Sequence, residues 1–314
     1  MPPSAKPSTA TREERSGLIA ALAAFGTWGL IPVYWKLLSH IPAGEILAHR
    51  FVWTTAFLVA LLTWQHRWTE VGDATRSRRA LVYCLASGLA ISVNWFFFIW
   101  AVNVGRVIET SLGYFMTPLV NVLLGATFLR ERLTRWQLLS VFLALLGVLN
   151  LTLGYGRFPW LAIILCVSFG LYGLLRKKSG VRPIPGLFLE TTLLTPIAVG
   201  YLIYLQSAGT GTFGSSSWSM MLIFVSTGVV TGLPLVWFGH AARHLRLTTV
   251  GFLQYLAPSC SFFLGVFLYR EPFTQAHLVT FIFIWIALFI FTAEAIWRWR
   301  AGRGQEELAE PVAR

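Results

Sequence analysis

The sequence predicts an all-α integral membrane protein of ten transmembrane helices, arranged as two inverted five-helix repeats. Three observations lead to this prediction. Of the 314 residues, 56% are apolar and 12% are charged, about half the charged share of a soluble domain. The apolar residues gather in blocks of about 20, the length that crosses a bilayer as a helix. One stretch of the chain also recurs 140 residues later.

Ten apolar blocks are long enough to span a membrane, and short connections separate them. The two longest connections are residues 64–79, which include several arginines, and residues 207–217, which are uncharged and rich in Gly, Ser and Thr. The first block exceeds the apolar region of a signal peptide, so we expect it to be retained. The expected spans are 17–38, 44–63, 80–103, 107–129, 136–153, 158–175, 186–206, 218–239, 248–269 and 277–297.

The repeated stretch aligns residues 118–134 with residues 258–274 without a gap. The first copy lies in span four and the second in span nine. Five spans separate them, and an odd number inverts the second copy in the membrane. The sequence therefore predicts one five-helix repeat over residues 17–155 and another over 156–299, an arrangement typical of secondary transporters. The identical positions are Pro118 and Pro258, Gly125 and Gly265, Arg130 and Arg270, Glu131 and Glu271, and Thr134 and Thr274.

The basic residues orient the ten spans. With the N-terminus inside, 20 of the 25 Lys and Arg residues fall on cytoplasmic segments and 5 on outer segments. Cytoplasmic loops of membrane proteins carry such an excess, which also explains the net charge of +12 without a nucleic-acid partner. We expect a multi-pass protein of the cell (inner) membrane, with cytoplasmic tails at residues 1–16 and 300–314.

Polar, aromatic and proline residues inside the spans are candidates for a substrate path. A proline in a span frees a backbone carbonyl, so it is either a packing kink or part of a cavity, and matched helix breaks in the two halves favour the cavity. Polar amides either tie helices together or line the path. Aromatic rings either stack on a ligand or anchor the helix at the interface. The path candidates are Trp28, Asn94, Trp95, Asn103, Tyr114, Pro118, Asn121, Gln254, Tyr255 and Pro258.

Four ionisable residues inside the spans are candidates for a gate or a coupling-ion site, because charge is costly in a bilayer. Glu45, His49 and Arg50 open span two at the outer side, and Glu45 and His49 share a helix face. The alternative for these three is an ion pair at the outer interface that reaches water. Glu190 opens span seven at the cytoplasmic side, as the approximate inverted counterpart of Glu45.

Metal and enzyme chemistry are not expected. Cys84, Cys166 and Cys260 all lie in apolar runs, which indicates small buried side chains. His240 and His244 have i, i+4 spacing without an acidic or thiol partner nearby, so we expect no metal site. No phosphate-binding loop, zinc-protease motif or serine-hydrolase motif occurs in the sequence. The sequence predicts neither a cofactor nor catalysis.

Five ordered blocks carry a family resemblance. They are E-I-L-A-H-R at 45–50, N-W-F-F-F-I-W-A-V-N at 94–103, E-T-S-L-G-Y-F-M-T-P-L-V-N-V-L-L-G at 109–125, Y-G-L-L-R-K-K at 172–178 and G-F-L-Q-Y-L-A-P at 251–258. With these blocks the chain resembles the drug/metabolite transporter superfamily, in its EamA branch, and more closely the RarD-type permeases. The resemblance covers nearly the whole chain. One departure is Arg130, which stands where the branch commonly has a glycine.

The resemblance implies an inner-membrane permease that moves a small organic solute, either a drug or a metabolite, by proton-coupled or exchange transport. Alternating access predicts a site near the midplane, lined by spans three, four, eight and nine, with Glu45 or Glu190 as gate or proton site. The alternative is a non-transporting membrane protein, such as a sensor or a membrane-embedded enzyme. The expected partners are a small solute and the bilayer; the sequence predicts no particular oligomeric state.

Overall fold

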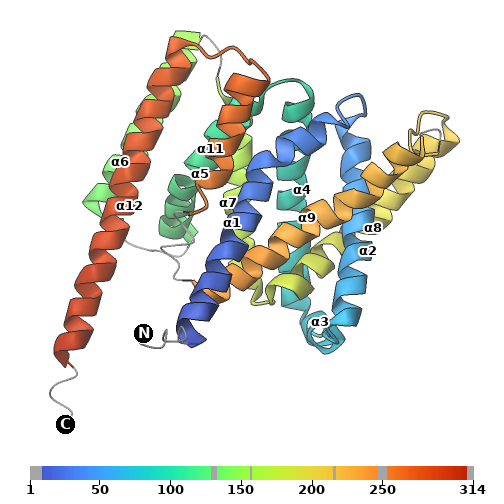
Figure 1. The fold of residues 1–314 in the computed structure, drawn as a ribbon, viewed down its shortest axis with the longest axis horizontal. Helices are drawn as coiled ribbons and strands as arrows, with labels where there is room; N and C mark the ends of the chain where they lie inside the picture. The colour runs from blue at the N-terminus through green and yellow to red at the C-terminus, as the bar shows by residue number, and fades with distance from the viewer. Residues whose placement is uncertain (1–8, 129–132, 156–157, 215–216, 246–252, 310–314) are drawn as a thin grey trace, which may run out of the picture.

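The structure is a computed structural model, which describes residues 9–128, 133–155, 158–214, 217–245 and 253–309. Within these residues all regular secondary structure is helical. Nine of the described helices are long and apolar enough to cross a membrane. They form one bundle, and the start of α1 and the end of α12 lie at the same end of it (Figure 1). The protein is an all-α integral membrane protein.

The long helices follow the expected spans closely, and the connections between them are short. The described helices are α1 (Thr9–Lys36), α2 (Ala43–Trp64), α3 (Trp68–Thr75), α4 (Arg78–Asn103), α5 (Val107–Phe128), α6 (Arg135–Tyr155), α7 (Trp160–Ser179), α8 (Pro183–Ser207), α9 (Trp218–His244), α11 (Leu256–Phe263), the π-helical turn η1 (Leu264–Leu268) and α12 (Gln275–Ala309).

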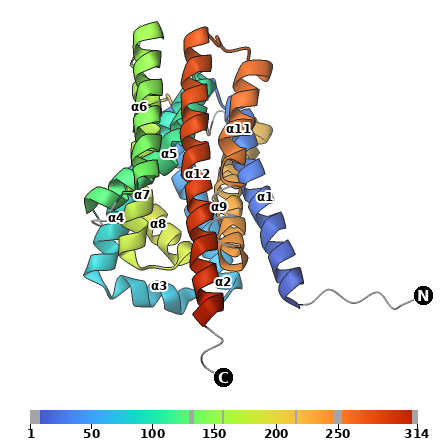
Figure 2. The ribbon, with the colours of Figure 1, turned by 90° about the vertical axis from the view of Figure 1, so that its left-hand side faces the viewer.

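Two segments differ from the expectation. The connection over residues 64–79 contains the short helix α3, which lies at the end of the bundle that holds both termini (Figure 2). Of the ninth expected span, 248–269, only residues from 253 onward are described, and there α11 and η1 cover Leu256–Leu268. This helical segment is shorter than the nine spanning helices. The preceding residues 246–252 lie outside the described part of the chain.

The bundle is apolar on its outer surface as well as in its core. Large side chains remain exposed along the spanning helices, including Leu153 at 82%, Ile197 at 70% and Phe289 at 74%. A surface helix of a soluble protein would turn a polar face outward. Helices that are apolar all round belong in lipid, so these exposed side chains face the acyl chains of the bilayer.

Helices of the two expected repeats alternate in the bundle. Helix α2 packs against α8 and α6 packs against α12, so equivalent helices of the two repeats meet. The pairing of α4 with α7 has its counterpart in the pairing of α9 with α1. Thr55 on α2 and Thr195 on α8 are 140 residues apart, and their hydroxyl oxygens lie 2.9 Å from each other. Equivalent residues would meet in this way on the axis of an inverted repeat; the boundary at residues 155 and 156 stays a prediction.

Two glycines let helices of different repeats approach closely. A Cβ added to Gly88 on α4 would lie 3.2 Å from the carbonyl oxygen of Glu190 on α8. A Cβ added to Gly228 on α9 would overlap the carbonyl group of Trp53 on α2. Gly88 and Gly228 are 140 residues apart in the sequence, the same interval that separates Thr55 from Thr195. Small residues at such contacts are the main device for close helix packing in lipid.

The repeat also extends to the caps of two helices. Before α6, the Thr134 N–H donates to Gln137 Oε1 at 3.1 Å and the Gln137 N–H donates to Thr134 Oγ1 at 3.1 Å. Before α12, the N–H of Thr274 donates to Nδ1 of His277 at 3.2 Å, and the His277 N–H returns a bond to Thr274 Oγ1 at 3.5 Å. Reciprocal caps satisfy N–H groups that the helix itself leaves unpaired. The recurring threonines in the sequence therefore mark helix starts.

Glu271 caps a helix of the other repeat. Its carboxylate accepts hydrogen bonds from the backbone N–H groups of Val107 and Ile108, at 2.7 and 2.8 Å, at the start of α5. Burial raises the pKa of Glu271, and these two N–H groups counteract part of that rise. The role is structural, because a negative charge stabilises a helix N-terminus. Its sequence equivalent Glu131 lies outside the described residues.

The prediction of matched helix breaks at Pro118 and Pro258 is wrong at Pro118, whereas a turn at residues 254–255 directly precedes α11, in which Pro258 lies. Helix α5 continues through Pro118 to Phe128. A proline removes only one backbone hydrogen bond, here the one that the Tyr114 carbonyl would otherwise accept, and α5 continues past it. Pro258 stands third in α11, within the first turn, where a missing N–H leaves no helical bond unmade.

Replacing Gly228 with alanine should separate α9 from α2. Because the new methyl group overlaps the Trp53 carbonyl, we expect Gly228→Ala to lower the free energy of unfolding by about 1–3 kcal/mol, measured by denaturation in lipid–detergent micelles. Gly239→Ala is the matched control, since an added Cβ at Gly239 on the same helix meets no atom within 4 Å. Equal stability of the two variants would contradict the close contact.

Candidate functional site

Three clusters of buried ionisable side chains contain the candidate residues. The Arg50 cluster comprises Tyr34, Trp35, Arg50, Asn94, Trp95 and Tyr114. The Glu45 pocket contains Glu45 and His49, and the Glu190 cluster contains Glu190 and Arg176. Arg50 lies five residues, or roughly 7.5 Å along the helix axis, beyond Glu45 on α2.

The Arg50 guanidinium lies between two tryptophan rings. Its Cζ is 3.7 Å from the ring centroid of Trp95 on α4 and 5.1 Å from that of Trp35 on α1. Arg50 is 6% exposed, and its Nε has no hydrogen-bond partner among the described residues. The side chains of Tyr34 and Tyr114 also lie near the guanidinium. The cation is therefore enclosed mainly by aromatic groups.

Hydrogen bonds fix the polar edge of this cluster. The Tyr114 hydroxyl donates to Asn94 Oδ1 at 2.9 Å. Asn94 Nδ2 donates to the Leu165 carbonyl at 2.9 Å and to Ser168 Oγ at 3.1 Å, both on α7. Asn94 thus ties α4 to α5 and α7, which agrees with the reading of a helix-tying amide, and at the same time it holds Tyr114 beside Arg50.

Tyr34 connects the cluster to the second repeat. Its hydroxyl donates to the Ile223 carbonyl at 2.6 Å and lies 2.8 Å from Ser226 Oγ, both on α9. Its ring meets Trp35 at 5.0 Å between centroids. The cluster is consequently built from α1, α2, α4 and α5 and is held in place by α7 and α9.

The Glu45 pocket lies beside the loop that follows α8. Glu45 Oε1 accepts the Thr212 N–H at 2.7 Å, whereas Oε2 has no partner among the described residues. The His49 ring packs against Phe213 at 4.8 Å and Phe224 at 4.3 Å, and its nitrogens likewise have no described partner. A cavity of about 390 Å³ extends from these residues along α2 and α8. Glu45, His49 and Arg50 are all buried, so an ion pair open to water does not describe them.

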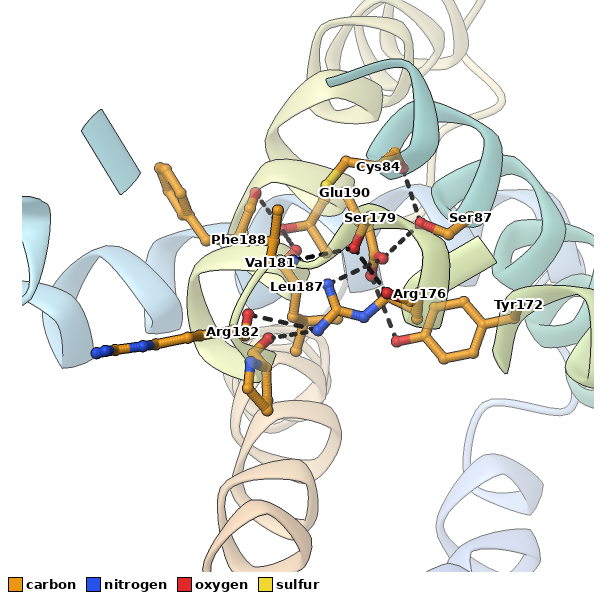
Figure 3. A network of polar contacts seen from close by, with 12 residues as sticks. Cys84, Ser87, Tyr172, Arg176, Ser179, Val181, Arg182, Leu187, Phe188 and Glu190 are labelled. Atoms are coloured by element: carbon orange, nitrogen blue, oxygen red, sulfur yellow. Dashed lines mark hydrogen bonds and ion pairs between the residues drawn. The ribbon is translucent and has the colours of Figure 1, made fainter. Parts of the chain in front are cut away.

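Glu190 is fully buried and has partners on two other helices (Figure 3). The Ser87 hydroxyl donates to Glu190 Oε1 at 2.6 Å, and the Tyr172 hydroxyl donates to Oε2 at 3.4 Å. Arg176 Nη1 lies 3.4 Å from Oε1 and forms an ion pair. A side chain at position 186 would overlap the guanidinium, so Gly186 leaves the space that Arg176 occupies.

The repeat spacing revises the counterpart of Glu190. The interval of 140 residues that relates Thr55 to Thr195 aligns Glu190 with Arg50 and not with Glu45. The contacts of Glu45 and Glu190 also differ, because Glu45 bonds to a loop backbone and Glu190 to side chains of α4 and α7. The two carboxylates are not structural equivalents.

Tyr255 lies in a separate apolar groove. Its ring stacks on Phe115 with centroids 6.3 Å apart. Tyr255 and Phe115 line a hollow of about 360 Å³ between α5, α11 and α12, together with Ser259 and residues of α12. Pro258 is buried in the same first turn of α11, and Gln254 is half-buried just before it. These three path candidates therefore lie around α11. Among the described residues, they show no contact with the Arg50 cluster.

The remaining path candidates make packing or tying contacts. Trp28 packs against Phe238 with centroids 5.8 Å apart. Asn103 Nδ2 donates to the Ile41 carbonyl at 3.2 Å, which ties the end of α4 to the connection before α2. Asn121 is exposed on α5. Of the ten path candidates, only Asn94, Trp95 and Tyr114 gather around Arg50.

Sequence reasoning missed several partners of the candidate residues. Arg176 belongs to a basic run that the charge pattern places at a cytoplasmic helix end, yet it turns inward to Glu190. The available signal was the buried carboxylate itself, since a carboxylate inside a span needs a partner. Thr212 and Phe213 lie in an uncharged loop, and no sequence pattern marks them as covering Glu45 and His49.

Buried ionisable clusters between spanning helices define a polytopic membrane protein with polar sites inside its bundle. Residues 15–153 match the model of the EamA-like transporter family. Protein RarD of Salmonella typhi is 43% identical over 92% of this chain and 98% of its own length. The uncharacterized transporter YojE of Bacillus subtilis (strain 168) is 43% identical, over 92% and 97% respectively. Protein RarD of Escherichia coli (strain K12) is 41% identical, over 92% and 98%.

The chain belongs to the EamA-like transporter family, and within it to the RarD-type permeases. A crystal structure of another protein, 19% identical, superposes with a TM-score of 0.57 over 88% of this chain and 97% of that one. That likeness shows the fold alone.

Removing Arg176 should leave the Glu190 carboxylate buried without its counter-ion. We expect Arg176→Met to lower the free energy of unfolding by about 3–5 kcal/mol, and a second change, Glu190→Gln, to restore part of that loss. Denaturation of the single and double variants measures the coupling between them. Lys178→Met, in the same basic run, is the control. If Arg176→Met and Lys178→Met are equally stable, the pair contributes nothing.

Proposed function

We propose that the protein is a secondary transporter that moves a small organic solute across the cytoplasmic membrane by alternating access. The observation that carries the proposal is the Arg50 cluster, where a buried cation is enclosed by helices of the first repeat and held by helices of the second. Ionisable groups in a bilayer are costly and mark functional paths by default. Family membership points to a transporter and away from an enzyme.

The two acidic clusters would act as the gates on either side of the Arg50 cluster. On one side, Glu45 holds the loop after α8 through the Thr212 N–H. On the other, Glu190 holds α4 and α7 through Ser87, Tyr172 and Arg176. Opening one set of contacts while the other persists would expose the Arg50 cluster to one side of the membrane at a time. Rocking of one repeat against the other is the usual way to achieve this.

Glu45 is the stronger candidate for a proton site. One of its oxygens has no partner among the described residues, and it lines the cavity beside His49. A bond to an ionised carboxylate is stronger than one to a neutral carboxyl group. Protonation of Glu45 would therefore weaken its hold on Thr212 and favour opening of the loop. Glu190 has three partners and is better placed as a fixed gate.

Neutralising Glu45 should uncouple transport from the proton gradient. We expect Glu45→Gln to lower pH-gradient-driven flux in proteoliposomes about tenfold, the effect of about 1.4 kcal/mol of coupling free energy, while solute exchange without a gradient persists. The solute used would be the one that most raises the melting temperature of the purified protein in a screen of amino acids, nucleosides and amphiphilic drugs.

Glu109→Gln serves as the matched control, because Glu109 forms a local ion pair with Arg106 at 2.6 Å. Unchanged gradient-driven flux in Glu45→Gln would remove Glu45 from the coupling step. A protein that binds solutes but moves none of them, with or without a gradient, would count against transport itself.

A further inference from the structure

Arg50 is buried without a counter-ion in the described part of the bundle. It is 6% exposed, and the ion pairs of the described residues involve other basic residues. A buried charge without a partner is strongly unfavourable, and the Trp95 ring at 3.7 Å offsets only part of that cost. The position therefore favours a ligand that brings a negative charge.

The carboxylates of the two acidic clusters do not pair with Arg50. Glu45, on the same helix, accepts the N–H of Thr212 with one oxygen. Glu190 is bound by Ser87 and Arg176. Neither carboxylate forms an ion pair with Arg50 among the described contacts, so no described residue supplies the anion and a ligand could.

The orientation of the donors indicates the chemistry of this anion. A guanidinium that lies over a ring uses its face for that contact, while its N–H groups point along its edge, in a fork that matches a carboxylate. Arg50 Nε has no partner among the described residues. The indole N–H of Trp35, the second ring beside the guanidinium, has none there either, although Trp35 is fully buried. Unpaired donors thus lie close together.

The surroundings also limit the charge and the body of the ligand. One cation balances one negative charge, which favours a monoanion over a phosphate dianion. The walls are the rings of Trp35, Trp95, Tyr34 and Tyr114, and the hydroxyl groups of the two tyrosines are already bonded to Ile223 and Asn94. Such walls offer apolar contact and few free donors, so the rest of the ligand should be apolar.

We propose that Arg50 binds the carboxylate of a small organic monocarboxylate with an apolar body, and that this is the class of solute the protein moves. That the protein moves this solute rests on the proposed transport function, whereas binding of the carboxylate does not depend on it. Because Arg50 is nearly inaccessible, the bound carboxylate is enclosed until the helices around it separate.

Binding can be measured on the purified full-length protein in detergent micelles. The probes are phenylacetate and 4-phenylbutyrate, each compared with its neutral amide and with phenethylamine as a cation, by melting temperature and by equilibrium binding of the radiolabelled acids. We expect the acids to stabilise the wild-type protein by several degrees and the amides and the amine to have little effect. Arg50→Met should weaken acid binding more than about tenfold, and Arg50→Lys should keep the preference for acid over amide with lower affinity.

Arg106→Met is the matched control. Arg106 also lies beside two tryptophans, with Cζ 5.7 Å from the Trp100 centroid and 5.2 Å from that of Trp160, but it is paired with Glu109. It should leave acid binding unchanged. Without ligand, Arg50→Met should melt no lower than the wild-type protein, because it removes an unpaired charge at similar volume. Acids that bind no better than their amides, to both the wild type and Arg50→Lys, would overturn the proposal and leave Arg50 a structural cation.

Flux measurements in proteoliposomes separate this inference from the proposed function. Arg50-dependent binding of the acids without any flux would support the carboxylate site and refute transport. Flux of a neutral or cationic solute, unaffected by Arg50→Met, would support transport and refute the carboxylate site.

Discussion

The cost of placing charge in a medium that cannot solvate it governs where polar groups stand in this protein. Glu190 meets that cost with Ser87, Tyr172 and Arg176, and the result is a tight joint between helices. Asn94 meets a smaller cost by using both ends of its amide. The aromatic rings around Arg50 offset only part of the cost of burying its charge. Buried polar groups with a full set of partners hold helices together, and buried polar groups without partners mark the candidate site. Burial alone does not distinguish the two kinds.

Much of the fold could be predicted from the sequence, because lipid imposes a simple rule on length and polarity. Spans of about 20 apolar residues have no alternative to helix in a bilayer, and nine of the expected ten appear as long helices in the described residues. Helix α3 was missed because a short amphipathic segment leaves little trace in a count of apolar residues. The break expected at Pro118 was wrong because the loss of a single backbone hydrogen bond does not interrupt α5.

The candidate site was predictable only as a set of residue types. Sequence reasoning selected Arg50, Asn94, Trp95 and Tyr114, which lie together. It selected Trp28, Asn103 and Asn121 by the same rules, but Trp28 and Asn103 make other contacts and Asn121 is exposed. What distinguishes the two sets is which face of a helix meets which neighbour. The Asn94 amide N–H groups, for example, find their acceptors more than 70 residues further along the chain. The repeat was the one pattern in the sequence that bears on such long-range relations. Its interval of 140 residues relates Thr55 to Thr195, which are in contact, and aligns Glu190 with Arg50.

The alternation of helices from the two repeats has a consequence for how the protein is made. Helix α4 needs α7 for the Asn94 amide and α8 for the Gly88 contact, and α2 needs α8 and α9. None of these partners exists while the ribosome is still synthesising the first five spanning helices. The early helices must therefore enter the membrane with amides and charges unmatched, sheltered by the insertion machinery or by one another. Assembly of the bundle is consequently a late event in biogenesis, and a nascent chain that stops after α6 should remain a target for membrane proteases.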